Sequence, residues 1–153
     1  MPNTYTQIHI QFIFAVKYRE SLIKQEWKDR LYQYITGIVQ RNGHKMIIIN
    51  GMADHLHILV GMRPNQSISD LLQDIKGSSS KWINEQKLTN KKFAWQEGYG
   101  AFSYSKQQIP RIISYIANQE EHHLKRSFRK EYLRFLQENS IEYDERYIFN
   151  DPE

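Results

Sequence analysis

The 153-residue sequence predicts one α+β domain built on an antiparallel four-stranded sheet. Three observations carry this prediction. Residues 6–18 alternate along the chain and are rich in Ile, Phe and Val, which is typical of a strand. Residues 44–50 and 55–62 are two further runs rich in Ile, Leu or Val, which are typical of strands. The short turn GMAD between them predicts a hairpin. Segments with helical spacing of apolar residues separate these strands.

The first half of the chain supplies two of the expected helices. Residues 26–41 place apolar side chains at helical spacing, and the Asn-Gly pair that follows ends the helix. After the hairpin, Ser67 is placed to cap a second helix, with Asp70 three residues on as the acidic partner of a capping box. We expect this helix to run to about residue 86.

The second half begins with the glycine-bounded run GYGAFSYS, which predicts the fourth strand. Ser105 then caps another helix, with Gln108 at the box position. Pro110 fits the first turn of that helix. A last helix is expected over about residues 127–139.

The resulting order is β-α-β-β-α-β-α-α, whose first six elements form a split β-α-β arrangement of ferredoxin-like or RRM-like type. It predicts a sheet with helices on one face, which leaves the other face free for a site, plus a C-terminal helix and a helical extension. We expect a single domain over residues 1–153, with a core of about 4–123 and an extension of about 124–153.

The charge is unevenly distributed. Residues 75–134 hold 12 Lys or Arg against 5 Asp or Glu, whereas residues 135–153 hold 1 against 6. Aromatic residues are interleaved with the basic ones, which suits a nucleic acid with stackable bases. The alternative is a solvated basic face above core aromatics. Cysteine is absent, which excludes disulfides and thiolate metal sites, and no apolar run approaches the roughly 20 residues of a membrane span.

The stretch DHLHILVGM places two imidazoles one residue apart. In a strand, His55 and His57 share one face, while Leu56, Ile58 and Val60 face the core. Two neutral imidazoles on one face can bind a single divalent ion if a third ligand comes from elsewhere. The alternative is a pair of half-exposed histidines without a ligand.

The stretch IPRIISYIANQEEHH offers such a ligand. Its isoleucines form an apolar stripe, and Tyr115 and Gln119 lie one turn apart on a neighbouring face. A tyrosine at the edge of a stripe commonly serves only packing. We interpret His122 and His123 as solvated residues at the end of the helix, where histidine suits the helix dipole.

Four motifs occur in order along the chain: HIQFIFAVKYRESLI, DHLHILV, FAWQEGYGAFSYS and YIANQEEHH. Together they resemble the HUH-type single-tyrosine transposases of bacterial insertion sequences, the insertion sequence 200/605 type, with their REP-associated relatives. HUH stands for histidine, hydrophobe, histidine. The resemblance covers most of the chain, and residues from about 124 to 149 look like the extension of a longer subgroup, expected to support the tyrosine helix, a dimer or hairpin recognition.

The resemblance implies that Tyr115 is the nucleophile and that His55, His57 and Gln119 hold Mg²⁺ or Mn²⁺. The tyrosine would attack a phosphate of single-stranded DNA, leaving a 5′-phosphotyrosine link and a free 3′-hydroxyl that later rejoins strands. Implied partners are single-stranded DNA with hairpin element ends and a second copy of the chain, in a homodimer that exchanges tyrosine helices. The protein would be cytoplasmic, in a bacterium or archaeon, and nucleoid-associated when acting.

Basic residues are the candidates for DNA contacts, although each is individually more typical of a solvated surface. They are Lys17, Arg19, Lys76, Lys81, Lys91, Lys92 and Arg111. The alternative function is a non-catalytic, RRM-like nucleic-acid-binding module or a domesticated regulatory protein. The absence of aromatic residues from the central hairpin argues against a base-stacking platform.

Overall fold

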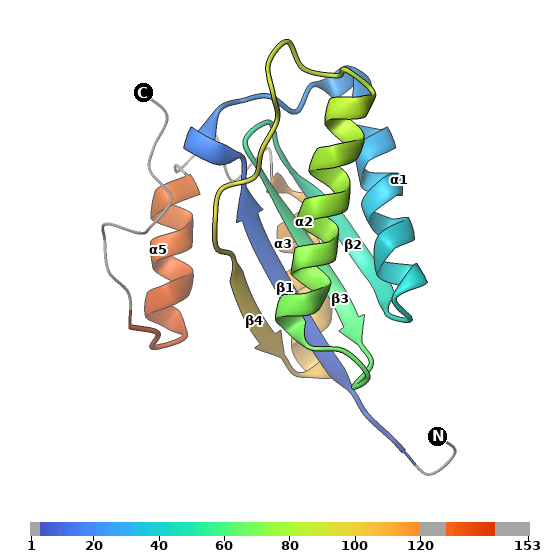
Figure 1. Cartoon of the computed structure of the whole chain (residues 1–153). Coiled ribbons are helices and arrows are strands. Elements are labelled where there is room, and N and C mark those ends of the chain that lie inside the picture. Colours follow the sequence, from blue (N-terminus) through green and yellow to red (C-terminus); the bar gives the residue numbers. More distant parts are fainter. Residues whose placement is uncertain (1–3, 120–127, 143–153) are drawn as a thin grey trace.

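The computed structural model describes residues 4–119 and 128–142, and its centre is a four-stranded antiparallel sheet (Figure 1). The strand order is β2-β3-β1-β4. The strands are β1 (Ile8–Ala15), β2 (Lys45–Met52), β3 (His55–Met62) and β4 (Gly100–Tyr104). Central strands β1 and β3 pair along their whole length, so both faces of the sheet are set by their alternation.

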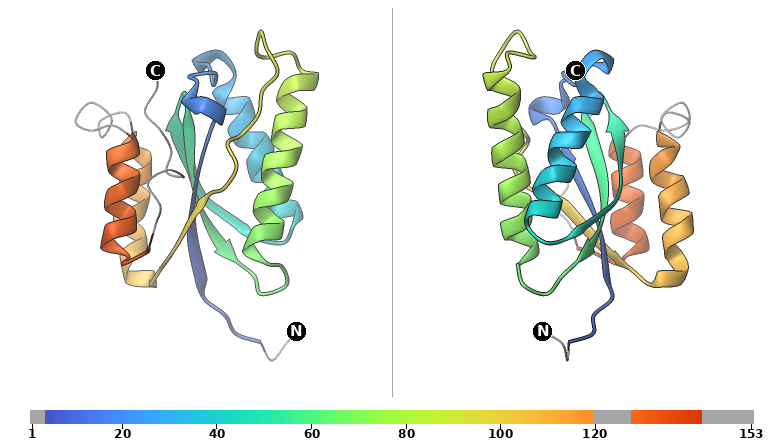
Figure 2. Two further views of the ribbon diagram at one scale, coloured as in Figure 1. Left: turned by 60° about the vertical axis from the view of Figure 1, so that its left-hand side comes forward. Right: turned by 90° about the vertical axis from the view of Figure 1, so that its right-hand side faces the viewer.

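Helices cover both faces of this sheet (Figure 2). Helices α1 (Gln25–Arg41) and α2 (Ile68–Glu85) lie on one face. Helices α3 (Ile109–Ala117) and α5 (Phe128–Glu138) lie on the other. The predicted α+β fold and element order are confirmed, but the second face is not free, because the two C-terminal helices pack against it through apolar contacts.

Both predicted N-caps form, and the Ser105–Gln108 pair forms a complete capping box. The Ser67 hydroxyl accepts a hydrogen bond from the Asp70 amide at 3.1 Å and begins α2. Ser105 and Gln108 form reciprocal hydrogen bonds between side chain and backbone across the short 3-10 helix η2 (Lys106–Gln108). In one of them the Ser105 amide donates to Gln108 Oε1 at 2.8 Å, and η2 leads directly into α3. Such local signals fix where a helix begins without help from the rest of the fold.

The alternation of β3 separates the core from the site. Leu56, Ile58 and Val60 are fully buried beneath α1 and α2, as predicted. His55 and His57 therefore lie on the opposite side of the sheet, where His57 contacts Tyr115 of α3 and Glu131 of α5.

The hairpin that carries the histidines requires a glycine at residue 51. A Cβ there would lie 2.2 Å from the His55 carbonyl oxygen, in a hairpin where Gly51 pairs with Leu56. No side chain fits at that distance, so the close approach of the two strands depends on Gly51.

Helix α5 docks onto β1 and β4. Tyr132 and Leu136 form a small apolar cluster with Ile13 and Phe102. The Tyr132 ring also packs against Gly100, where a Cβ would come within 2.7 Å of the tyrosine hydroxyl. The glycine at the start of β4 therefore makes room for the docked helix.

Some expectations fall on residues outside the described ranges. They concern His122 and His123, residues 124–127 of the extension, and its tail from residue 143 onward. Within the described ranges, none of the helices is long and apolar enough to span a bilayer.

Candidate active site and metal centre

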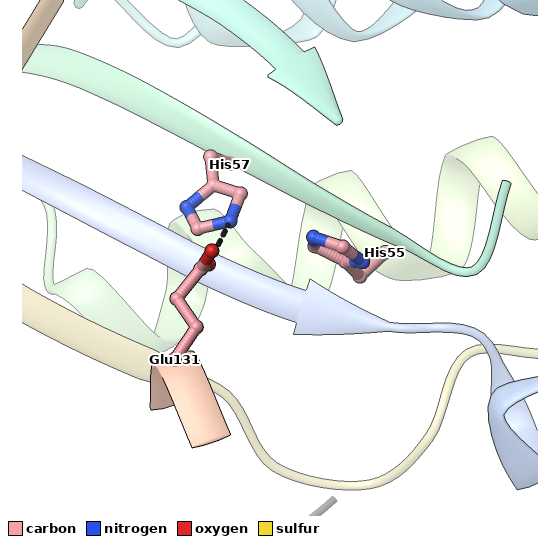
Figure 3. A group of neighbouring side chains, drawn as sticks. All are labelled: His55, His57 and Glu131. Carbon is pink, nitrogen blue, oxygen red and sulfur yellow. Dashed lines mark ion pairs between the residues drawn. The ribbon is translucent and has the colours of Figure 1, made fainter. Parts of the chain in front are cut away.

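Three buried side chains from two elements converge beneath the C-terminal helices (Figure 3). His55 and His57 of β3 are fully buried, with ring centroids 5.2 Å apart. Glu131 of α5 is 2% exposed and points toward His57. One ligand atom from each of the three lies within 4.8 Å of the other two, which is compact enough to hold a single metal ion.

His55 is held in one tautomer by its neighbours. Its Nδ1 donates to Asp54 Oδ1 at 2.8 Å, and Arg19 in turn donates to Asp54 Oδ2 from Nη2 at 2.6 Å and Nε at 3.0 Å. Burial lowers the pKa of His55 to about 4, so the ring is neutral at pH 7. The proton is on Nδ1, and the Nε2 lone pair therefore faces the site.

The carboxylate behind His55 stays ionised. Burial alone would raise the pKa of Asp54, but the hydrogen bond and charge of His55, together with the Arg19 guanidinium, lower it to about 2. A histidine backed by an ionised carboxylate is the usual arrangement of a metal-binding imidazole.

Gln119 lies on the other side of His55. It is fully buried, its Oε1 lies 3.3 Å from His55 Nε2, and its amide nitrogen donates to the Tyr115 carbonyl at 3.4 Å. Because Asp54 keeps the proton on Nδ1, the two atoms that face each other at 3.3 Å both carry lone pairs. A shared cation would turn this opposition into favourable coordination, so the donor set fits a divalent ion.

Glu131 joins the second histidine to the tyrosine. Its Oε1 lies 3.0 Å from His57 Nε2. Burial would raise the pKa of Glu131, but hydrogen bonds from His57 and Tyr115 and the charges of the histidines lower it to about 2. The site therefore holds a carboxylate oxygen beside imidazole nitrogens and, at Gln119, an amide oxygen, a mixture suited to Mg²⁺ or Mn²⁺.

Tyr115 borders both the histidines and a cavity. Its ring centroid is 6.0 Å from that of His57 and 5.4 Å from that of Phe135. It helps to line a cavity of about 510 Å³ between α3 and α5, into which Arg111 and Arg134 also project. The Arg134 guanidinium is paired with Glu138, which also lines the cavity, with Nε 2.8 Å from Glu138 Oε1.

The end of the tyrosine helix is fastened to the sheet. Asn50 of β2 donates to the carbonyl oxygens of Ile116 at 2.9 Å and Ala117 at 3.2 Å. These carbonyls lie in the last turn of α3, where the helix itself provides no partner. The contact fixes Tyr115 relative to the strands that carry the histidines.

Two of the basic residues expected to contact DNA are committed elsewhere. Arg19 is 3% exposed and paired with Asp54, and Lys76 is half-buried, with its Nζ donating to the carbonyls of Gln96 at 2.7 Å and Gly98 at 2.8 Å. Burial also lowers the pKa of Lys76. These contacts give both residues a structural role, and their predicted DNA contacts stay predictions.

The other five basic candidates have exposed side chains. Lys81 lies 3.9 Å from Glu85, and Lys91 pairs with Glu20. Arg111 is the candidate that lies next to Tyr115, because both line the same cavity. The remaining two are Lys17 and Lys92.

Sequence reasoning missed Glu131, Gln11 and Asp54. Glu131 is an acidic residue directly before Tyr132 in a helix, a pattern that it shares with solvated acidic residues. Gln11 is an amide at the centre of an otherwise apolar strand, and Asp54 directly precedes the histidine motif. A lone polar residue in an apolar run marks a buried hydrogen-bonding role.

Comparison with known proteins shows the family of this chain. Residues 4–119 match the family model described as "Transposase IS200 like". The chain belongs to the IS200-like transposase family. It is 28% identical to the ISDra2 transposase TnpA of Deinococcus radiodurans over 120 residues, covering 75% of this chain and 86% of that protein. It is also 28% identical to the IS200 transposase of Salmonella typhimurium over 115 residues, covering 71% and 74%.

Solved transposase structures share the fold. A putative transposase from Deinococcus radiodurans superposes with a TM-score of 0.61 at 24% identity, covering 76% of this chain and 94% of that one. A REP-associated tyrosine transposase bound to a REP hairpin also gives 0.61, at 14% identity, covering 79% and 72%. Helix α5 lies outside the residues that match the IS200-like family model.

Proposed function

We propose that this IS200-like transposase cleaves and rejoins single-stranded DNA through a 5′-phosphotyrosine intermediate at Tyr115, with the help of a divalent metal ion. The observation that carries the proposal is the convergence of Tyr115 with His55 and His57 in one site beside a cavity. A nucleophile, a metal-binding cluster and access for a substrate are the parts that such a reaction needs.

The metal would be held by His55, His57, Gln119 and Glu131. The first three are the ligands implied by the sequence motifs, and Glu131 adds a negative charge from α5. When bound, the ion would polarise a non-bridging oxygen of the scissile phosphate. Imidazole ligands favour Mn²⁺ over Mg²⁺ on softness, while the carboxylate accommodates either.

The chain itself would supply the nucleophile and its orientation. The Tyr115 oxygen forms the new bond to phosphorus as the bond between phosphorus and the 3′ oxygen breaks. The tyrosine proton leaves, and the departing 3′ oxygen takes up one from solvent. Asn50 and the packing of α3 hold the tyrosine in place, and the same link stores the energy for rejoining without ATP.

Arg111 is the best-placed candidate for a contact to a DNA phosphate, since it lines the same cavity as Tyr115. Contacts to the part of the DNA strand outside the cavity stay predictions for four lysines, which are Lys17, Lys81, Lys91 and Lys92. Binding of hairpin element ends and exchange of tyrosine helices in a homodimer also stay predictions. Light scattering of the chain with and without a hairpin oligonucleotide tests hairpin binding and the dimer.

The deciding experiment uses the full chain, labelled single-stranded oligonucleotides from the DNA flanking its own gene, and Mn²⁺ or Mg²⁺. We expect a protein–DNA adduct that survives denaturation, needs the metal, is absent with duplex DNA, and maps to Tyr115 by peptide mass. Tyr115→Phe removes only the hydroxyl, so this variant should bind the oligonucleotide without becoming attached to it.

Tyr5→Phe is a matched control, because this tyrosine is 90% exposed and distant from the cavity in sequence; it should form the adduct at the wild-type rate. An adduct on Tyr104, which lines the same cavity, would refute the assignment of the nucleophile. Metal-independent binding without any adduct would favour the non-catalytic binding module, even though α3 and α5 cover the sheet face that such a module uses for stacking.

A further inference from the structure

Gln11 lies behind His57 in a short hydrogen-bonded relay. It is fully buried on β1, among apolar neighbours. The Tyr104 hydroxyl donates to Gln11 Oε1 at 2.8 Å, and Gln11 Nε2 donates to His57 Nδ1 at 2.9 Å. Burial raises the pKa of Tyr104 to about 12, so its hydroxyl keeps its proton. A buried amide between two functional groups marks a hydrogen-bonding role and not a packing one.

This relay determines which tautomer His57 adopts. Because Nδ1 accepts from Gln11, the single proton of the neutral ring resides on Nε2, which faces Glu131 Oε1 at 3.0 Å. The Tyr104 hydroxyl and the Gln11 amide nitrogen each meet an acceptor in this arrangement. A protonated ring nitrogen has no lone pair for a metal, however, so the arrangement leaves Nε2 of His57 unable to bind one.

The two histidines therefore differ. Asp54 can only accept from His55, which keeps the Nε2 lone pair of that ring facing the site. Gln11 can donate or accept, depending on which end of its amide faces His57. An amide flip, which exchanges the positions of the oxygen and the nitrogen, needs only rotation about χ3, and this torsion is soft in glutamine.

We propose that Gln11 is a positioning residue whose amide turns over when a divalent ion binds at His57, so that its oxygen accepts a proton from Nδ1 and frees Nε2. This inference rests on the metal site of the proposed function. The ring stays neutral, because the proton on Nε2 goes to solvent and solvent supplies another to Nδ1. The amide nitrogen then donates to the Tyr104 oxygen, whose hydrogen turns toward the cavity that this residue lines.

Substitutions at residue 11 should move metal affinity in opposite directions. In Gln11→Glu, both oxygens accept, so the side chain can receive the Tyr104 hydroxyl and the His57 Nδ1 proton at once, without turning over. We expect Mn²⁺ to bind about tenfold more tightly than in the wild type at mildly alkaline pH. Gln11→Met keeps the size but loses the acceptor, and we expect affinity to fall by about 10–100-fold.

Mn²⁺ affinity is measured on the full chain without DNA, from the electron paramagnetic resonance signal of free Mn²⁺. Gln33→Met is the matched control, because Gln33 is an exposed residue of α1. This variant should bind Mn²⁺ as the wild type does. Nitrogen NMR of the His57 ring gives a second readout. It should show the proton on Nε2 in the metal-free wild type, on Nδ1 with saturating Mg²⁺, and on Nδ1 in metal-free Gln11→Glu.

The outcomes separate the two proposals. If the wild type binds no Mn²⁺, the metal site and this inference both fail. If the wild type binds Mn²⁺ but both variants at residue 11 bind within about twofold of it, only the inference fails. A metal-free wild type that already carries the proton on Nδ1 also overturns it, and this readout holds even if Gln11→Met does not fold.

Discussion

The buried, neutral His55 predicts that the metal-free protein loses stability at mildly acidic pH. Its pKa is about 4 in the folded chain and 6.5 when exposed. Between these values the unfolded chain binds the proton and the folded chain does not, so stability falls as pH drops from about 6.5 to about 4. At about 1.4 kcal/mol for each pKa unit, the loss comes to about 3 kcal/mol.

The test compares urea unfolding of the wild type and His55→Gln at pH 7 and pH 4, with a chelator present. Glutamine cannot titrate and can still donate to Asp54, so the variant should lack this component of the pH dependence. We expect the wild type to lose about 3 kcal/mol more than the variant over this range. The carboxylates of Asp54 and Glu131 add to the acid loss in both proteins, because their folded pKa values of about 2 lie below the ordinary values of 3.8 and 4.5, so the comparison with the variant isolates the histidine. Parallel losses in the two proteins would refute the reasoning.

Packing at Gly100, the Arg19 ion pair and the Asn50 cap each predict a further change in urea unfolding. Gly100→Ala should lower the free energy of unfolding by about 1–3 kcal/mol, because the added methyl group pushes α5 away. Gly37→Ala, in open space on α1, should raise it by about 0.5–1 kcal/mol. Equal effects of the two substitutions would contradict this contrast. Arg19→Met leaves the buried Asp54 carboxylate without its positively charged partner and should lower the free energy of unfolding by about 3–5 kcal/mol. A loss below about 1 kcal/mol would argue against the pairing. Asn50→Ala removes two hydrogen bonds to the last turn of α3, should cost about 1 kcal/mol, and should slow adduct formation; an unchanged rate would exclude a positioning role.

Features that depend on local sequence could be predicted. The caps at Ser67 and Ser105 involve residues three positions apart, and both form. The shared face of His55 and His57 follows from strand alternation alone, and the structure places them together on that face.

Features that depend on distant packing could not be predicted in this way. Glu131 reaches His57 only because Tyr132 fits beside Gly100 and docks α5 on the sheet. Arg19 turns inward because Tyr18 and Arg19 adopt left-handed backbone angles, with φ of 60° and 56°. A cation after a strand has the same sequence signature whether it faces solvent or a buried carboxylate, so pattern reasoning had no means of telling them apart.

The origin of the metal-binding cluster in two distant parts of the chain has a consequence for synthesis. The histidines lie on β3, in the first half of the sequence, whereas Glu131 lies on α5, after every other described helix and strand. Domains emerge from the ribosome N-terminus first, and contacts of high sequence separation form late. A nascent chain therefore displays its histidines, and then its tyrosine, before the carboxylate arrives. The complete donor set comes into being only once translation has passed α5.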